Sequence, residues 1–111
     1  MKPNRAGKME KEIQRILSGC LIKEEWVPPL AAISRVEASP DLALAKVYVT
    51  AISEEEAMSL AQRLEAQAGR WRAFLAASLK ARTVPKLQFL ADTSLFGAER
   101  VLLLLQDKPR P

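Results

Sequence analysis

The fold is decided by residues 64–94, LEAQAGRWRAFLAASLKARTVPKLQFLADTS, where two helical patterns precede a short strand. The helical patterns meet at Gln67-Ala68-Gly69, where we predict that Gly69 interrupts the helix at a cost of roughly 1 kcal/mol relative to alanine. The apolar stripes on the two sides of this run are out of register, so we predict two helices joined by a kink. After them, Pro85 opens a strand in which apolar residues alternate with others.

Positive charge is concentrated in the same stretch. From residue 63 to residue 86 there are six basic residues and one acid, a net charge of +5, although the whole chain carries only +4. Lysines and arginines gathered in this way favour an anionic partner such as nucleic acid. We predict that Arg70 and Arg72 flank the apolar stripe of the second helix and that Lys80 projects away from it. The predicted phosphate contacts are Arg70, Arg72, Lys80, Arg82 and Lys86.

A second basic edge belongs to the first predicted helix. Apolar residues recur there at helical spacing from Met9 to Leu21, while Lys8, Lys11 and Arg15 fall on the opposite face. One interpretation is that this face is simply solvated. The other is that it meets phosphates, and on that interpretation the three residues join the predicted nucleic-acid interface.

The chain is predicted to be a single α+β domain over residues 1–106, followed by a flexible tail, 107–111. Pro28-Pro29 prevents the first helix from continuing, and Ser53 begins another because its side chain can cap the N–H of Glu56. In chain order we predict a helix over 5–24, strands over 30–39 and 44–51, a helix after residue 53, the kinked second helix, the third strand, and a short final helix through 101–105.

Several side chains have both a structural and a functional interpretation. The apolar residues that alternate from Ala45 to Val49 should pack on helices, so that Tyr48 and its polar neighbours face solvent or a partner. Trp71 is interpreted as a core residue in preference to a platform for stacking bases. Cys20 lies within an apolar stripe and is interpreted as a small buried hydrophobic residue.

The composition narrows the possible functions. The 111-residue chain has one cysteine and no histidine, so neither an intramolecular disulfide nor a histidine-based triad can form. The carboxylates that follow Ser53 are interpreted as a helix start and not as a metal site. A carboxylate-pair enzyme is the one catalytic alternative left open. We expect a cytoplasmic protein without catalysis, metal or cofactor. We also expect no membrane segment, because a membrane helix needs about 20 apolar residues.

Three motifs, in order, resemble the ribosome-binding factor A family. The stretch SPDLALAKVYV, residues 39–49, resembles that family's Ser-x-Asp-Leu-x-x-Ala-x-Val-Tyr-Val. Lys11-Glu12-Ile13 with Ile16-Leu17 is similar to its first helix. The second signature, Gly-x-x-Arg through Arg-x-Val-Pro-x-Leu-x-Phe to Asp-x-Ser, is matched by Gly69, Arg72, Leu75, Arg82, Val84-Pro85, Leu87, Phe89, Asp92 and Ser94. The resemblance covers residues 4–105.

The resemblance implies a type II KH-like domain with a three-stranded sheet packed on helices. It also implies a non-catalytic assembly factor that binds 16S rRNA of the free 30S ribosomal subunit, aids processing of the 16S rRNA 5′ end, and is associated with growth in the cold. We expect a monomer with no small-molecule substrate. Ordinary KH domains clamp RNA with a Gly-x-x-Gly loop, which this sequence lacks, so we predict recognition of phosphates and shape. The alternative is a protein-interaction module without direct RNA contact.

Overall fold

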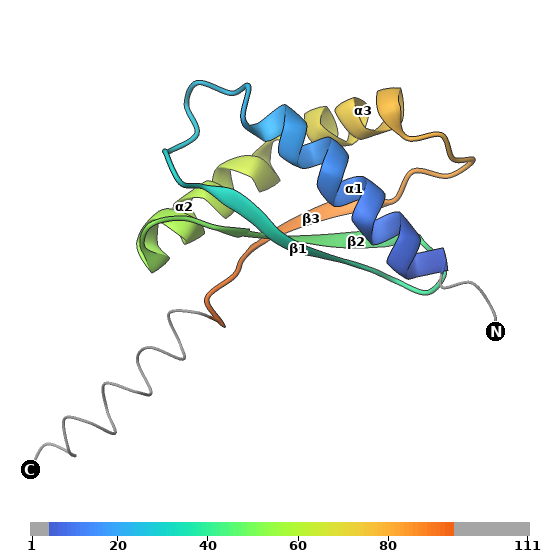
Figure 1. The fold of residues 1–111 in the computed structure, drawn as a ribbon, viewed down its shortest axis with the longest axis horizontal. Helices are drawn as coiled ribbons and strands as arrows, with labels where there is room; N and C mark the ends of the chain where they lie inside the picture. The colour runs from blue at the N-terminus through green and yellow to red at the C-terminus, as the bar shows by residue number, and fades with distance from the viewer. Residues whose placement is uncertain (1–4, 95–111) are drawn as a thin grey trace, which may run out of the picture.

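In the computed structural model, which describes residues 5–94, helices cover one face of a three-stranded sheet (Figure 1). The strands are ordered β1-β2-β3, with β1 and β2 antiparallel and β2 and β3 parallel. The predicted α+β fold and its order of elements are confirmed; the predicted final helix and tail lie outside the described residues. The elements are α1 (Arg5–Leu21), β1 (Ala32–Ala38), β2 (Leu44–Thr50), α2 (Glu54–Ala66), α3 (Ala68–Ser78) and β3 (Lys86–Ala91).

Some elements are shorter than predicted. α1 ends at Leu21 and not at residue 24, because a tight turn follows in which the N–H of Lys23 donates to the carbonyl of Cys20 at 3.2 Å. β1 starts two residues later than predicted, since Leu30 has a φ of 70°, which a strand does not accommodate. β1 and β2 also each stop one residue before their predicted ends.

The start of α2 is the one that the sequence predicts. The Ser53 hydroxyl oxygen accepts a hydrogen bond from the N–H of Glu56 at 3.1 Å, which satisfies one of the free donors of the first turn. Three glutamates in that turn suit the positive end of the helix dipole. This cap fixes where α2 begins, and therefore which residues it turns toward the sheet: Ala57, Leu60, Ala61 and Leu64.

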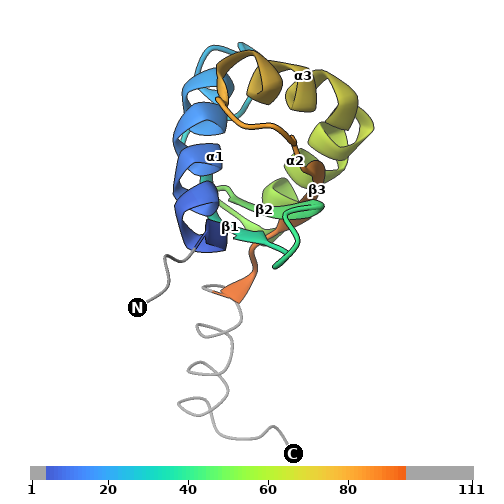
Figure 2. The ribbon, with the colours of Figure 1, turned by 90° about the vertical axis from the view of Figure 1, so that its right-hand side faces the viewer.

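The core lies between the helices and the inner face of the sheet (Figure 2). Ala45, Val47 and Val49 of β2 are fully buried, as their alternation predicts. Trp71 of α3 is 1% exposed, which confirms that it is a core residue and rules out base stacking in this conformation. Cys20 packs against the core but is only half-buried, so the prediction that it is a buried residue is wrong.

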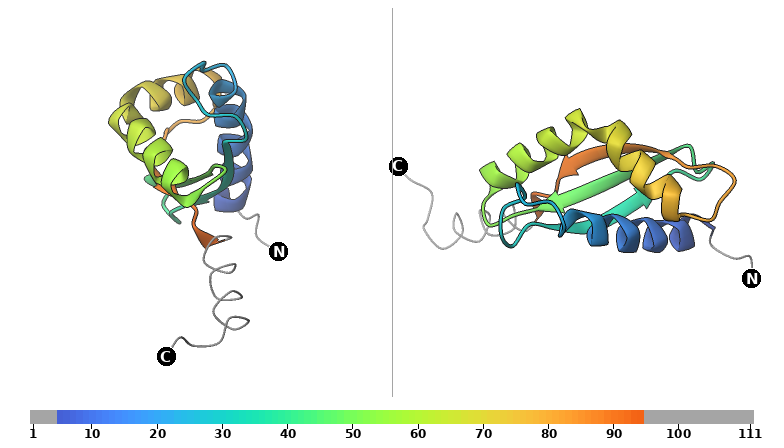
Figure 3. Two further views of the ribbon diagram at one scale, coloured as in Figure 1. Left: turned by 90° about the vertical axis from the view of Figure 1, so that its left-hand side faces the viewer. Right: turned by 90° about the horizontal axis from the view of Figure 1, so that it is seen from above.

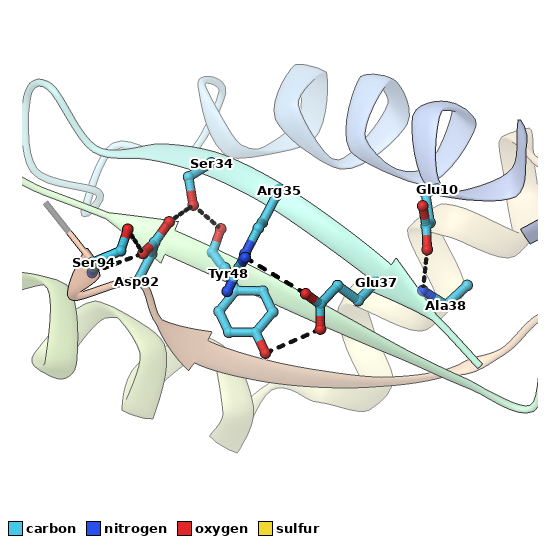
Figure 4. Close-up of polar contacts among 8 residues, drawn as sticks. All are labelled: Glu10, Ser34, Arg35, Glu37, Ala38, Tyr48, Asp92 and Ser94. Atoms are coloured by element: carbon cyan, nitrogen blue, oxygen red, sulfur yellow. Dashed lines mark hydrogen bonds and ion pairs between the residues drawn. The ribbon is translucent and has the colours of Figure 1, made fainter. Parts of the chain in front are cut away.

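The outer face of the sheet is not covered by the three helices (Figure 3). Tyr48 lies there, as predicted, but one face of its ring is occupied by the Arg35 guanidinium, 4.1 Å from the ring centroid. The Tyr48 hydroxyl donates to Glu37 at 3.3 Å, and Arg35 pairs with the same carboxylate at 3.5 Å (Figure 4). These contacts make Tyr48 part of a surface network among its own neighbours.

Asp92 ties the end of β3 to β1 (Figure 4). The register of β1 shifts at Ser34, whose hydroxyl donates to the Asp92 Oδ2 at 2.6 Å. The N–H and hydroxyl of Ser94 donate to the Oδ1 at 3.0 and 2.6 Å. The hydrogen bond from Ser34, followed by those from Ser94, lowers the pKa of Asp92 from 3.8 to about 2.

The low pKa makes the contribution of Asp92 dependent on pH. Because the folded pKa lies below the ordinary value, the stabilisation is complete above about pH 4 and is lost as the pH falls toward 2. Partial solvent exposure reduces the effect, so we expect Asp92→Asn to lower the free energy of unfolding by about 1 kcal/mol at pH 7. Urea denaturation should show a smaller difference at pH 2 than at pH 7, because the folded carboxyl group becomes increasingly protonated at the lower pH. An equal loss at both pH values, or a matching loss in the exposed control Glu25→Gln, would contradict this assignment.

Candidate nucleic-acid interface

The predicted kink is a single-residue break at Gln67. Its backbone (φ −111°, ψ 20°) leaves the helical region, while its carbonyl accepts hydrogen bonds from the N–H groups of Arg70 at 2.9 Å and Trp71 at 3.1 Å. One residue thus ends α2 and starts α3. The Gln67 side chain fixes the same geometry, because its Oε1 accepts from the Trp71 indole Nε1 at 3.2 Å.

Gly69 is not the cause of the break, contrary to the prediction. It lies in the first turn of α3, and its φ is not positive. A Cβ added there would meet no atom within 4 Å. Neither backbone conformation nor packing within residues 5–94 therefore requires a glycine at this position.

Arg70 and Arg72 leave α3 on opposite sides, as predicted, but both are engaged within the protein. Arg70 Nη1 and Nη2 donate to the two carboxylate oxygens of Glu24 at 2.9 and 3.1 Å. Arg72 Nη2 donates to the carbonyl of Val84 at 2.7 Å and its Nε to the carbonyl of Pro85 at 3.2 Å. Each arginine thus holds one neighbouring segment of the chain, a role that the sequence prediction did not assign to either.

The segment between α3 and β3, residues 79–85, and Lys86 at the start of β3 carry the next three predicted residues, and residues 79–86 are called the basic loop here. Lys80 is not on the helix as predicted, because α3 ends at Ser78. Lys80 and Arg82 are exposed, and among residues 5–94 their side chains make no hydrogen bond or ion pair. Lys86 is exposed at the start of β3 and alternates with buried Leu87, which places its side chain toward the outer face of the sheet.

The second basic edge is formed by α1. The beginning of α1 and the α3–β3 connection are at the same end of the molecule (Figures 1 and 3). Lys8, Lys11 and Arg15 are all exposed. Arg15 is paired with Glu12 at 3.1 Å, whereas Lys8 and Lys11 form no ion pair within the described part of the chain.

The predicted interface therefore separates into two groups. One group, at the end of the molecule where α1 begins, comprises the basic loop together with Lys8 and Lys11. The other group is at the kink, where Arg70 pairs with Glu24. Arg63, which the prediction did not include, also lies there, with its guanidinium 4.2 Å from the centroid of the Trp26 ring. The sequence analysis did not predict the contacts of Glu24 and Trp26, because nothing in the sequence between α1 and β1 indicates that this segment reaches the kink.

Chemically, the described residues offer charge and hydrogen-bond donors. No group of three or more cysteine, aspartate or glutamate residues within 5–94 is arranged to hold a metal ion. Over the same residues, no helix combines the length and apolar character needed to cross a bilayer. What the arrangement can do is bind phosphates through its two basic groups.

The helix order, the mixed sheet and the break between α2 and α3 define a type II KH-like domain without the Gly-x-x-Gly loop. The family model described as ribosome-binding factor A matches residues 5–105. A ribosome-binding factor A from Dichelobacter nodosus is 37% identical over 106 residues, covering 91% of this chain and 87% of that protein. The chain belongs to the ribosome-binding factor A family.

Other proteins of the same family are also similar to this chain. A ribosome-binding factor A from Xanthomonas euvesicatoria pv. vesicatoria is 43% identical over 79 residues, which is 71% of this chain but only 61% of that protein's length. The solution structure of a putative ribosome-binding factor A from Thermotoga maritima matches with a TM-score of 0.68 and 30% identity, over 85% of this chain and 93% of that one. A Thermus thermophilus ribosome-binding factor A, fitted into a map of its 30S complex, matches with a TM-score of 0.66 and 29% identity, over 78% and 93% of the two chains.

Proposed function

We propose that this protein binds the 30S ribosomal subunit by contacting 16S rRNA and assists maturation of the subunit without catalysis. Membership of the ribosome-binding factor A family supports the proposal, as does similarity to a Thermus thermophilus relative placed in a 30S complex. Processing of the 16S rRNA 5′ end, a role in the cold, action as a monomer and a cytoplasmic location are parts of the same proposal. They rest on the family resemblance.

The observation that carries the RNA contact is the unpaired charge of the basic loop. Lys80 and Arg82 extend from a segment that is held in place by Arg72, and no acidic side chain within residues 5–94 neutralises them. Cations held this way can bind phosphates at little cost, because no internal ion pair has to break first. The same end of the molecule presents Lys8 and Lys11, so that a phosphate backbone can cross both elements.

The test is co-sedimentation with free 30S subunits over a series of salt concentrations. We expect Lys80→Glu and Arg82→Glu each to weaken binding roughly three- to tenfold and to reduce the slope of log K against log salt by about one. The charge-matched control is Lys23→Glu, an exposed lysine on the α1–β1 segment. If the control weakens binding as much as the two loop variants do, the basic loop is not the interface.

A protein-interaction module remains the second candidate, because two large apolar side chains are exposed near one another in sequence. Ile22 is 80% exposed and Leu30 is 75% exposed, and both lie on the segment between α1 and β1. Residues of this kind favour contact with protein over contact with phosphates. Binding that survives nuclease treatment of the subunit and responds to Ile22→Ser, but not to Arg82→Glu, would select this candidate.

A further inference from the structure

The guanidinium of Arg70 already holds an anion, which is the carboxylate of Glu24. The pair is bidentate, with distances of 2.9 and 3.1 Å from Nη1 and Nη2 to the two oxygens. Trp26 adds a third donor, since its indole Nε1 lies 3.0 Å from the same Glu24 Oε1. Three N–H donors from two elements therefore converge on one carboxylate.

Aromatic rings and a second cation complete the surroundings of this site. The Arg70 guanidinium lies 4.9 Å from the centroid of the Phe74 ring, and Arg63 stacks on Trp26 at 4.2 Å. The Arg70 side chain is 46% exposed and that of Glu24 is 15% exposed, so solvent reaches the guanidinium while the carboxylate is mostly covered. A planar guanidinium fork fits phosphate oxygens as well as carboxylate oxygens, which makes the site suitable for either anion.

We propose that Glu24 occupies the place of an RNA phosphate at the kink and competes with RNA for Arg70. This inference rests on the proposed function, because it names a second phosphate site for the same RNA. Glu24 lies in the turn segment after α1 and not inside a helix, so it can withdraw without breaking regular structure. The basic loop then makes the first contact with RNA. The kink binds a phosphate only where the new contact with Arg70 offsets the loss of the ion pair between Glu24 and Arg70.

The salt dependence follows from this exchange. In the wild type, Arg70 loses the Glu24 carboxylate when it binds a phosphate, so this contact adds little to the number of counterions released. Without the Glu24 charge, the Arg70 contact with phosphate adds about one ion to those released. Removal of the competitor should therefore increase both the affinity and its sensitivity to salt.

The experiment compares wild type, Glu24→Gln, Glu25→Gln and the double variant Glu24→Gln/Arg70→Gln in co-sedimentation with free 30S subunits over a salt series. Glutamine keeps an oxygen that can accept from Trp26, and circular dichroism checks that each variant is folded. We expect Glu24→Gln to bind roughly three- to fivefold more tightly, with a slope steeper by about one. Glu25 is an exposed carboxylate on the same segment, so Glu25→Gln measures the effect of removing charge alone.

Each outcome decides the inference. A gain in Glu24→Gln that is absent from Glu25→Gln and lost in the double variant supports a phosphate at Arg70. If affinity is unchanged or lower in Glu24→Gln, or if the gain persists in the double variant, the inference is overturned while the proposed function stands. If no form of the protein binds 30S subunits, the proposed function fails and the inference fails with it.

Discussion

Trp71→Ala is expected to lower the free energy of unfolding by about 4 kcal/mol, the largest effect of any change considered for this protein. The indole is 1% exposed, so its removal leaves a cavity in addition to losing buried apolar area. Its ring meets Phe74 edge-on at 5.4 Å and Phe89 at 6.4 Å between centroids, so one side chain joins α3 to β3. Small domains are stable by only about 5–15 kcal/mol, and the variant should keep little of that margin.

Urea denaturation followed by circular dichroism measures the loss. The control is Trp26→Ala, which removes the same side chain from a half-buried position at the edge of the core. We expect the control to cost less than half as much, because its site is open to water and can partly collapse. If the two variants lose similar amounts, Trp71 is not the central contact between the helices and the sheet.

The fold was predictable because local signals in the sequence agree with one another. Ser53 with three glutamates marks the start of α2, and alternation from Ala45 to Val49 identifies the buried face of β2. Both signals depend only on neighbouring residues. The ends of α1 and β1 were less predictable, because they depend on a tight turn and on the positive φ of Leu30.

The candidate site was only partly predictable, for a related reason. The sequence shows how many basic residues lie near the kink, but not which acids or carbonyls reach them in space. Glu24 is 46 residues away from Arg70 along the chain, yet the two form a bidentate pair. Conversely, the helical pattern in the sequence continues past Ser78, where α3 ends, and so it places Lys80 wrongly on the helix. Which charges remain free for a partner is thus a property of tertiary contacts.

Arg72→Ala is expected to have the second-largest effect, because Arg72 positions the basic loop. Its guanidinium donates to two successive carbonyls, those of Val84 at 2.7 Å and Pro85 at 3.2 Å. Charge-assisted bonds of this kind contribute roughly 1.5–3 kcal/mol each when buried, and these are partly exposed. We expect a loss of about 2 kcal/mol in the free energy of unfolding, together with weaker binding to 30S subunits as the loop loses its support.

The variant Arg72→Lys separates a positioning role from direct contact with phosphate. Lysine keeps the charge but is a point donor on a flexible stem, so it cannot hold both carbonyls as the planar guanidinium does. If Arg72 positions the loop, Arg72→Lys should lose most of the stability that Arg72→Ala loses, whereas Arg82→Ala should cost less than about 0.5 kcal/mol because Arg82 is exposed. If Arg72→Lys instead keeps wild-type stability and 30S affinity, charge alone matters there, and Arg72 belongs among the phosphate contacts.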